Sequence, residues 1–318
     1  TRVTLCLPTT RIMHRGATLG GINLTMVITS PAPEVLRVRT YHHMGALQKG
    51  PEFALCQTAE QPLNVTSDEE RIVVTSGTLS LEIGKKNWYM AYKRNGEVIT
   101  KSGAKDLACM KTDWKGDYYD KGDITETYMR QQLSMGVGEL IYGLGERFTA
   151  FIKNGQSVSI WNEDGGTSTY QSYKNIPFYI SNKGYGVFVN HPEKVEFEVA
   201  TEQVTKTAFS VEGGCLDYYL FNGPTMKEVL TRYTDLTGKP SLPAPWTFGL
   251  WLSTSFTTNY DEETVMSFVN GMLERDIPLR TFHFDCFWMK EFHWTDFEWD
   301  SRVFPDPEGM LRRKKEKG

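Results

Sequence analysis

The sequence predicts a mixed β and α/β chain, in which an antiparallel β-sandwich is followed by the first β/α units of a parallel sheet. Up to about residue 222, short strand-like runs alternate with turn residues, and helical periodicity is almost absent, which favours a sandwich. After a proline-rich joint at residues 239–245, the expected order is strand, helix, strand, loop, helix. That order is typical of a parallel sheet. The 318 residues suffice for two domains.

The strands of the first part are predicted from β-forming runs bounded by turn signals. We expect them at residues 21–29, 34–41, 71–75, 79–83, 88–93, 97–100, 186–190 and 195–199. The segment Ser30-Pro31-Ala32-Pro33 is expected to break the first two runs apart. Asn95-Gly96 gives the strongest hairpin signal, because this pair readily adopts the positive φ angles of a type I′ turn.

The joint between the two parts is predicted to start with a helix at residues 224–236. Pro224 suits its first turn, and Gly238 and Pro240 should end it. The stiff segment 239–245 follows. We therefore expect a sandwich domain at 1–223, a linker helix and joint at 224–245, and a second domain that begins at 246.

In the second domain we expect a strand at 246–256 and a helix capped by Asp261. The buried stripe of this helix should comprise Val265, Phe268, Val269, Met272 and Leu273. Residues 281–290 are predicted to form a buried strand, followed by a long loop at 291–304 and a helix that starts at Asp306.

Asp285 is the most unusual residue of the predicted strand 281–290. On a strand, Phe282, Phe284, Cys286 and Trp288 would share one face, with Asp285 on the other face near the carboxyl end. A buried carboxylate is costly unless something pairs with it, and ligands of β/α barrels bind at that end of the strands. Asp285 is thus a candidate ligand contact. A structural ion pair is the alternative.

Composition excludes several classes of function. The net charge of −4 gives no reason to expect nucleic acid. The five cysteines lie far apart without a C-x-x-C pair, which argues against a disulfide framework and a zinc site. No apolar run has membrane-spanning length and no signal peptide is recognisable, although the chain begins at Thr1 rather than Met. A cytoplasmic location is therefore expected.

Several motifs, in this order and spacing, resemble glycoside hydrolase family 31. They are YGLGERF at 142–148, IPFY at 176–179, VFVNHP at 187–192, FGLW at 248–251, FDCFW at 284–288 and FPDPEG at 304–309. The segment FDCFW resembles the α-xylosidases of the family. The resemblance implies that residues 246–318 are the start of a (β/α)8 catalytic barrel. Such a barrel needs roughly 250 residues, so we expect the chain to be the front portion of a longer enzyme or a fragment of one.

The resemblance implies a retaining α-glycosidase that acts on terminal α-linked xylose and needs no metal and no organic cofactor. The nucleophile and the acid/base, both aspartates in this family, lie on later strands. No residue of 1–318 is therefore assigned a catalytic role, and the chain by itself is expected to be inactive. The implied partners are an oligosaccharide or α-xyloside substrate and, through open barrel strands, a second copy of the chain.

By the same resemblance, Asp285 would bind sugar hydroxyls in the −1 subsite, and Phe256, Cys286 and Phe287 would line that pocket. Asp164, in the glycine-rich loop WNEDGGT at 161–167, would contact the aglycone. The plain alternatives are barrel core for the pocket residues and a surface loop for Asp164.

Two other functions remain open from the sequence. One is an α-glucosidase or transglycosylase of the same family. The other is a non-catalytic carbohydrate-binding sandwich, which would not need the β/α units after Pro245.

Overall fold

The structure is a computed structural model that describes residues 2–42, 50–52, 54–56, 61–115, 123–164, 169–253 and 261–317. These residues form two compact units, Thr1–Lys239 and Pro240–Gly318. The first is built almost entirely from antiparallel strands, and the second holds two parallel strands with helices.

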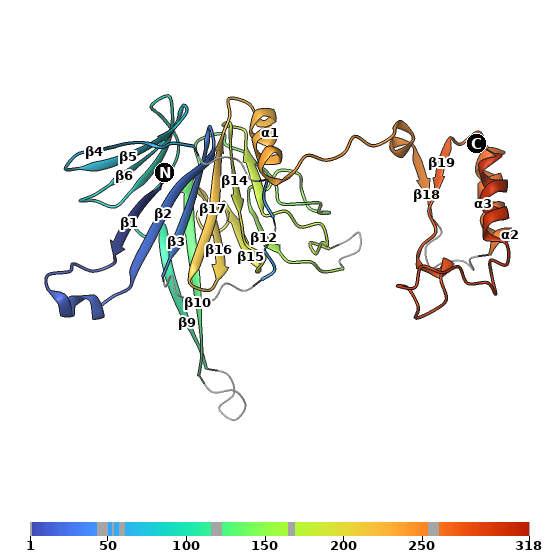
Figure 1. Cartoon of the computed structure of the whole chain (residues 1–318), viewed down its shortest axis with the longest axis horizontal. Coiled ribbons are helices and arrows are strands. Elements are labelled where there is room, and N and C mark those ends of the chain that lie inside the picture. The colour runs from blue at the N-terminus through green and yellow to red at the C-terminus, as the bar shows by residue number, and fades with distance from the viewer. Residues whose placement is uncertain are drawn as a thin grey trace. The chain divides into compact units, whose positions relative to one another are not determined.

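The first large sheet of the N-terminal unit has seven strands among the described residues, all paired antiparallel (Figure 1). In spatial order they are β1 (Val3–Pro8), β2 (Asn23–Ala32), β3 (Val35–Tyr41), β17 (Cys215–Asn222), β14 (Tyr185–Val189), β13 (Phe178–Ser181) and β11 (Ile141–Gly143). Strand β17 thus pairs on one side with β14, which shortly precedes it in sequence, and on the other with β3, from near the start of the chain.

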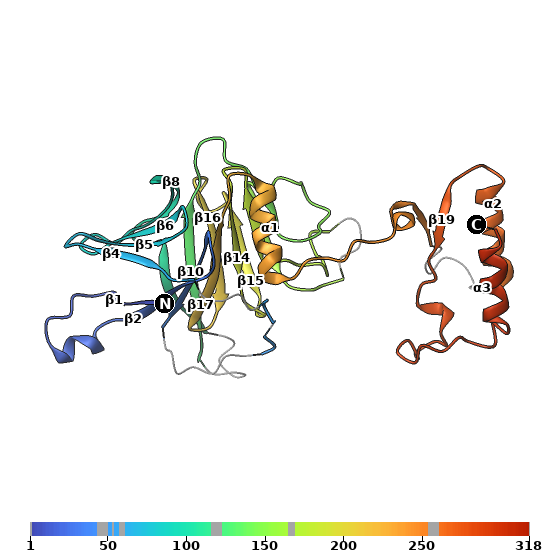
Figure 2. The same cartoon turned by 45° about the horizontal axis from the view of Figure 1, so that its top comes forward.

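The second large sheet faces the first across the core (Figure 2). Its strands are β12 (Gln156–Ile160), β15 (Val195–Val199), β16 (Lys206–Glu212), β10 (Asp123–Ser134) and β9 (Leu107–Lys115). Rings from the two sheets meet in the core, as Phe209 and Tyr218 do in an edge-to-face contact with centroids 5.2 Å apart. The predicted antiparallel sandwich is therefore confirmed.

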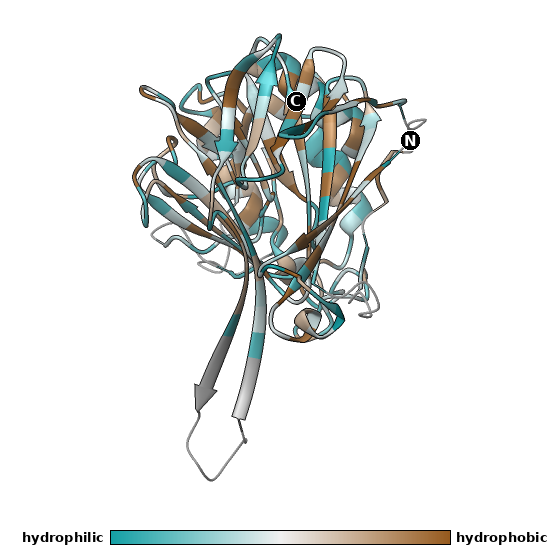
Figure 3. Cartoon of the chain, turned by 90° about the vertical axis from the view of Figure 1, so that its left-hand side faces the viewer, coloured by the Kyte–Doolittle hydropathy of each residue, from teal (hydrophilic) through white to brown (hydrophobic). Residues whose placement is uncertain are grey.

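A third sheet is a meander that closes one side of this core. It comprises β4 (Asn64–Ser67), β5 (Arg71–Ser76), β6 (Leu79–Gly84), β7 (Met90–Arg94) and β8 (Glu97–Ser102). Asn95 and Gly96 have φ angles of 49° and 87°, so the predicted β7–β8 hairpin is confirmed. Hydrophobic and hydrophilic residues are interspersed along the strands (Figure 3), as expected for strands such as β2 that bury one face, whereas β14 is buried on both faces.

The predicted break at residues 30–33 was misplaced. Strand β2 continues to Ala32, and the chain reverses at Glu34, which has a φ of 67°. The register shifts between Thr29 and Ala32. Such an irregularity tolerates Pro31 because bulged residues need not donate to the sheet.

Helix α1 (Met226–Thr237) packs on the first sheet. Its N-cap is Thr225, which forms a capping box with Glu228, so Pro224 precedes the helix instead of occupying its first turn as predicted. The Tyr233 ring stacks on Phe178 of β13, with centroids 3.8 Å apart.

The C-terminal unit contains the parallel pair β18 (Leu250–Leu252) and β19 (Leu279–Phe282), with helices α2 (Glu262–Leu273) and α3 (Pro307–Lys315). Asp261 caps α2 as predicted, because its Oδ1 accepts from the Thr264 N–H at 2.7 Å. The buried face of α2 is narrower than predicted: Val265 and Val269 are buried, whereas Phe268 and Leu273 are exposed. Buried Phe304 and Met310 complete the core of this unit.

Both predicted strands of this unit were too long. Instead of a strand from 246, Pro245–Phe248 form the 3-10 turn η2, with Pro245 in its first position, and β18 ends at Leu252. Strand β19 ends at Phe282, and Cys286–Trp288 form the 3-10 turn η3. The expected alternation of faces over residues 283–288 is therefore wrong, because the Asp285 side chain caps a turn.

Candidate functional site

Asp285 lies just beyond the carboxyl end of β19. Because β18 and β19 run parallel, their carboxyl ends share one edge, and the His283 N–H donates to the Leu252 carbonyl at 2.8 Å. Asp285 is half-buried, and its Oδ1 accepts from the Cys286 N–H at 2.7 Å. The carboxylate is thereby held at the edge where ligands of β/α folds bind.

The segment that leads to Asp285 is anchored on its aromatic side. Phe284 makes edge-to-face contacts with Phe304 and Trp299 at 5.7 Å. The Lys314 ammonium lies over the Phe282 and Phe284 rings, 4.6 and 4.3 Å from their centroids. Burial lowers the pKa of Lys314 to about 8. These contacts fix the backbone immediately before Asp285.

Cys286 and Phe287 follow Asp285 in the η3 turn, and both are half-buried. Burial, together with the neighbouring Asp285 carboxylate, raises the pKa of the Cys286 thiol, so this group is neutral near pH 7. The Phe287 ring packs against the core of the unit and lies edge-on to Trp294 at 6.1 Å.

Of the predicted site residues, the structure therefore brings together Asp285, Cys286 and Phe287. Phe256 lies outside the described residues. Asp164 is an exposed residue of the N-terminal unit. Its role as an aglycone contact stays a prediction.

The YGLGERF segment forms a tight turn at the end of β11. Gly143, Leu144 and Gly145 have consecutive positive φ angles of 108°, 66° and 89°. A Cβ at Gly143 would lie 2.6 Å from the Phe178 carbonyl oxygen, and one at Gly145 would lie 2.1 Å from that of Lys174. Only glycine at both positions allows this close approach to residues 174–178.

Arg147 follows this turn and donates to four acceptors, in the turn itself, at the end of β12 and in residues 170–175. Its Nε donates to the Leu144 carbonyl at 3.1 Å and its Nη1 to the Tyr170 carbonyl at 3.0 Å. Its Nη2 donates to the Ser159 carbonyl at 2.8 Å and also to Asn175 Oδ1. The sequence does not predict these contacts of Arg147, because three of the acceptors are main-chain carbonyl oxygens, which every residue has.

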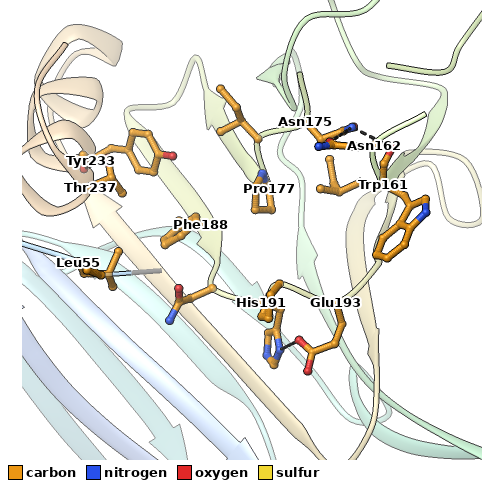
Figure 4. A pocket seen from close by; sticks show the side chains of 15 residues that line it. Leu55, Trp161, Asn162, Asn175, Pro177, Phe188, His191, Glu193, Tyr233 and Thr237 are labelled. Atoms are coloured by element: carbon orange, nitrogen blue, oxygen red, sulfur yellow. Dashed lines mark hydrogen bonds and ion pairs between the residues drawn. The ribbon is translucent and has the colours of Figure 1, made fainter. Parts of the chain in front are cut away.

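Beside these segments lies a pocket of about 630 Å³ in the N-terminal unit (Figure 4). Some of its polar side chains bond to one another, as Asn175 does to Asn162 and as His191 Nδ1 does to Glu193 at 3.0 Å. His191 Nε2 accepts from the main-chain N–H of Asp217 at 2.9 Å. With Nε2 as acceptor, Nδ1 carries the proton. Both ring nitrogens of His191 are thus engaged in hydrogen bonds within the N-terminal unit.

Two further kinds of feature, a metal-binding cluster and a membrane-spanning helix, are both absent from the described residues. Within the described residues, no group of three or more His, Cys, Asp or Glu side chains could hold a metal ion. None of the described helices is both long and apolar enough to cross a membrane.

Two family models match the chain. The N-terminal galactose mutarotase-like domain of glycosyl hydrolase 31 matches residues 25–198, and the TIM-barrel domain of glycosyl hydrolases family 31 matches residues 240–318. These matches agree with the sandwich and with the start of a β/α barrel. The chain belongs to glycoside hydrolase family 31.

Among curated relatives, the chain is 47% identical over 317 residues to the alpha-xylosidase XylQ of Lactiplantibacillus pentosus, covering 99% of the chain and 40% of that protein. It is 45% identical over 320 residues to an alpha-xylosidase of Emericella nidulans, covering 96% and 40%. The chain thus spans about 40% of the length of these relatives.

Solved structures of the family share the fold. A dextranase from Flavobacterium johnsoniae, in complex with glucose, superposes with a TM-score of 0.77 at 19% identity, covering 100% of this chain and 37% of that one. An alpha-xylosidase from a soil metagenome, in complex with xylose, gives 0.69 at 19% identity, covering 93% and 44%.

Proposed function

We propose that the complete protein is a retaining α-glycosidase that removes terminal α-linked xylose from an oligosaccharide or α-xyloside. The observation that carries this proposal is the Asp285 carboxylate at the carboxyl edge of β18 and β19, within the FDCFW segment. The similarity to two alpha-xylosidases supports the choice of sugar.

In the proposed reaction, a carboxylate nucleophile and a carboxylic acid about 5 Å apart act through a covalent glycosyl-enzyme. Neither role is assigned to a residue of 1–318, and no metal or organic cofactor takes part. Asp285 accepts hydrogen bonds from two sugar hydroxyls and orients the ring. Residues 246–318 form the start of the catalytic barrel.

The preference for xylose over glucose is assigned to the surroundings of Asp285. The two sugars differ by one hydroxymethyl group on C5. A bulky Phe287 leaves no room for that group, and a neutral Cys286 thiol is a poor partner for its hydroxyl. Overpacking a rigid site costs about 1–3 kcal/mol, which corresponds to a preference of roughly 5-fold to 150-fold.

The test is kcat/KM of the full-length enzyme on matched aryl α-xyloside and α-glucoside. We expect at least about a fivefold preference for the xyloside, and a smaller preference in Phe287→Ala. Equal efficiency on both substrates would favour an α-glucosidase, to which a Bacillus thermoamyloliquefaciens relative 29% identical to this chain also points. Turnover of neither substrate would favour a carbohydrate-binding role.

Location and assembly are proposed on separate grounds. All five cysteines are free thiols, which supports a reducing compartment such as the cytoplasm. The parallel pair β18–β19 has no further strand partner among the described residues, and open edges favour association with a second copy of the chain. Size measurement by light scattering on residues 1–318 tests this assembly, because the later barrel strands of the complete protein would cover these edges.

A further inference from the structure

The connection between β19 and α3, at residues 283–306, is a long loop that is closed at its base. Connections between strands and helices of α/β folds typically have about two to six residues, and much longer ones are usually functional. Met289 forms an antiparallel bridge with Trp299, and the Asp300 N–H donates to the Trp288 carbonyl at 2.9 Å. The loop beyond this base starts at the carboxyl edge of β19, where β/α folds build ligand sites from such loops.

Three aromatic side chains of this loop are exposed. Phe292 is 90% exposed, Phe297 is 76% exposed and Trp294 is 43% exposed, and none of them belongs to the core cluster of the unit. The two phenylalanines have φ angles of 63° and 55°, in the left-handed region that is costly for a bulky residue. Such strain is typical of functional sites. Rings that are exposed at a cost to the backbone therefore indicate a binding surface.

Trp294 connects these exposed rings to the turn that carries Asp285. The Trp294 ring lies edge-on to Phe287, with centroids 6.1 Å apart, and it stacks with Phe292 at 6.0 Å and an interplanar angle of 26°. Phe287 follows Asp285 by two positions in the η3 turn and packs against the core of the unit. The three rings thus form a continuous aromatic row that runs from the Asp285 turn to solvent.

Polar contacts hold the loop on both sides of Trp294. Arg302 Nη2 donates to Glu291 Oε2 at 2.8 Å, and Arg302 Nε donates to Asp300 Oδ1 at 2.9 Å. His293 Nδ1 lies 2.9 Å from Asp296 Oδ2. These charged groups bond to one another within the loop, so the ring faces of the aromatic row are the surface that it offers to a neutral ligand.

We propose that Trp294 is the stacking platform for the sugar attached to the terminal xylose, with Phe292 holding its ring in place. A pyranose ring presents apolar C–H faces and polar hydroxyl edges, so an aromatic face beside a carboxylate suits its chemistry. This inference rests on the proposed glycosidase function and deepens it, because it names the residue that selects the leaving group. Binding of xylose itself at Asp285 should depend little on Trp294.

The experiment compares two substrates on the full-length enzyme. One is α-xylosyl fluoride, which has no second sugar. The other is whichever disaccharide with α-linked xylose at its non-reducing end the wild-type enzyme hydrolyses fastest. In Trp294→Leu, which keeps an apolar side chain but no ring face, we expect kcat/KM for the disaccharide to fall about tenfold, through a higher KM. Turnover of the fluoride should stay within about twofold of wild type. Trp294→Phe keeps an aromatic face and should lose no more than about threefold on the disaccharide.

Phe292→Gly separates binding from stability. Glycine adopts a φ near 63° without strain, and the ring that it removes is almost fully exposed. The variant should therefore unfold at or above the wild-type temperature. It also removes the stacking partner of Trp294, so kcat/KM for the disaccharide should fall about threefold or more, while turnover of the fluoride stays unchanged. A ring that served only the fold would give a lower melting temperature and an unchanged ratio of the two substrates.

Trp246 provides the matched control. It is 54% exposed, its ring lies 6.1 Å from that of Trp251, and it belongs to the η2 turn at the amino end of β18. Trp246→Leu should keep the wild-type ratio of the two substrates. An unchanged ratio in Trp294→Leu, or an equal loss on both substrates, would overturn the platform, as would a wild-type enzyme that accepts the fluoride but no disaccharide. Failure of the wild-type enzyme to hydrolyse either substrate would instead overturn the proposed function.

Discussion

Gly145→Ala is expected to destabilise the protein by about 2–6 kcal/mol, from steric overlap of about 1–3 kcal/mol and backbone strain of about 1–3 kcal/mol. The residue has a φ of 89°, and an added Cβ would lie 2.1 Å from the Lys174 carbonyl oxygen and 3.0 Å from the Ile176 nitrogen. Both neighbours are backbone atoms that carry the 174–178 segment, so neither can move aside as a flexible side chain could.

Gly96→Ala separates the two contributions. Gly96 has nearly the same φ, 87°, but no atom within 4 Å of its added Cβ. It should therefore lose only the backbone part, about 1–3 kcal/mol. Thermal unfolding of both variants measures the difference, at about 2–4 °C per kcal/mol for a domain of this size. Equal melting temperatures for the two variants would show that the close approach to Lys174 has no energetic consequence.

The sandwich could be predicted because its signals are local. At Asn95-Gly96 the turn dihedrals follow from two adjacent residues, and the cap at Asp261 follows from its place before an apolar stripe. At Pro31 the same local reasoning was wrong, because a strand with an irregular register accepts a residue that normally ends one. Such an irregularity depends on pairing with β3, which no single segment encodes.

The candidate site was only partly predictable. The alternation of aromatic residues before Trp288 is compatible with a strand, and the observed turn is distinguished by the hydrogen bonds from the Cys286 N–H to the Asp285 side chain and from the Met289 N–H to the Cys286 carbonyl. The position of Asp285 beyond the carboxyl end of β19 nevertheless agrees with the prediction. Arg147 could not be found in this way, because its partners are carbonyls brought together by the fold.

Asp285→Ala in the full-length enzyme should lower kcat/KM by about two to four decades. A hydrogen bond to a charged group contributes roughly 1.5–3 kcal/mol, and two sugar hydroxyls bound to one carboxylate therefore correspond to about 3–6 kcal/mol. The melting temperature should fall slightly, since the substitution also removes the cap on the Cys286 N–H, and lost caps typically cost about 0.5–2 kcal/mol.

Asp285→Asn separates binding of the sugar from the structural role. An asparagine oxygen can still accept from the Cys286 N–H, so the variant should unfold at nearly the wild-type temperature. It has lost the negative charge and half of the acceptor capacity, so kcat/KM should remain at least about tenfold below wild type. If Asp285→Asn restored both stability and activity, the carboxylate would be a turn cap rather than a ligand for the sugar, and the −1 subsite would have to be sought at another strand end.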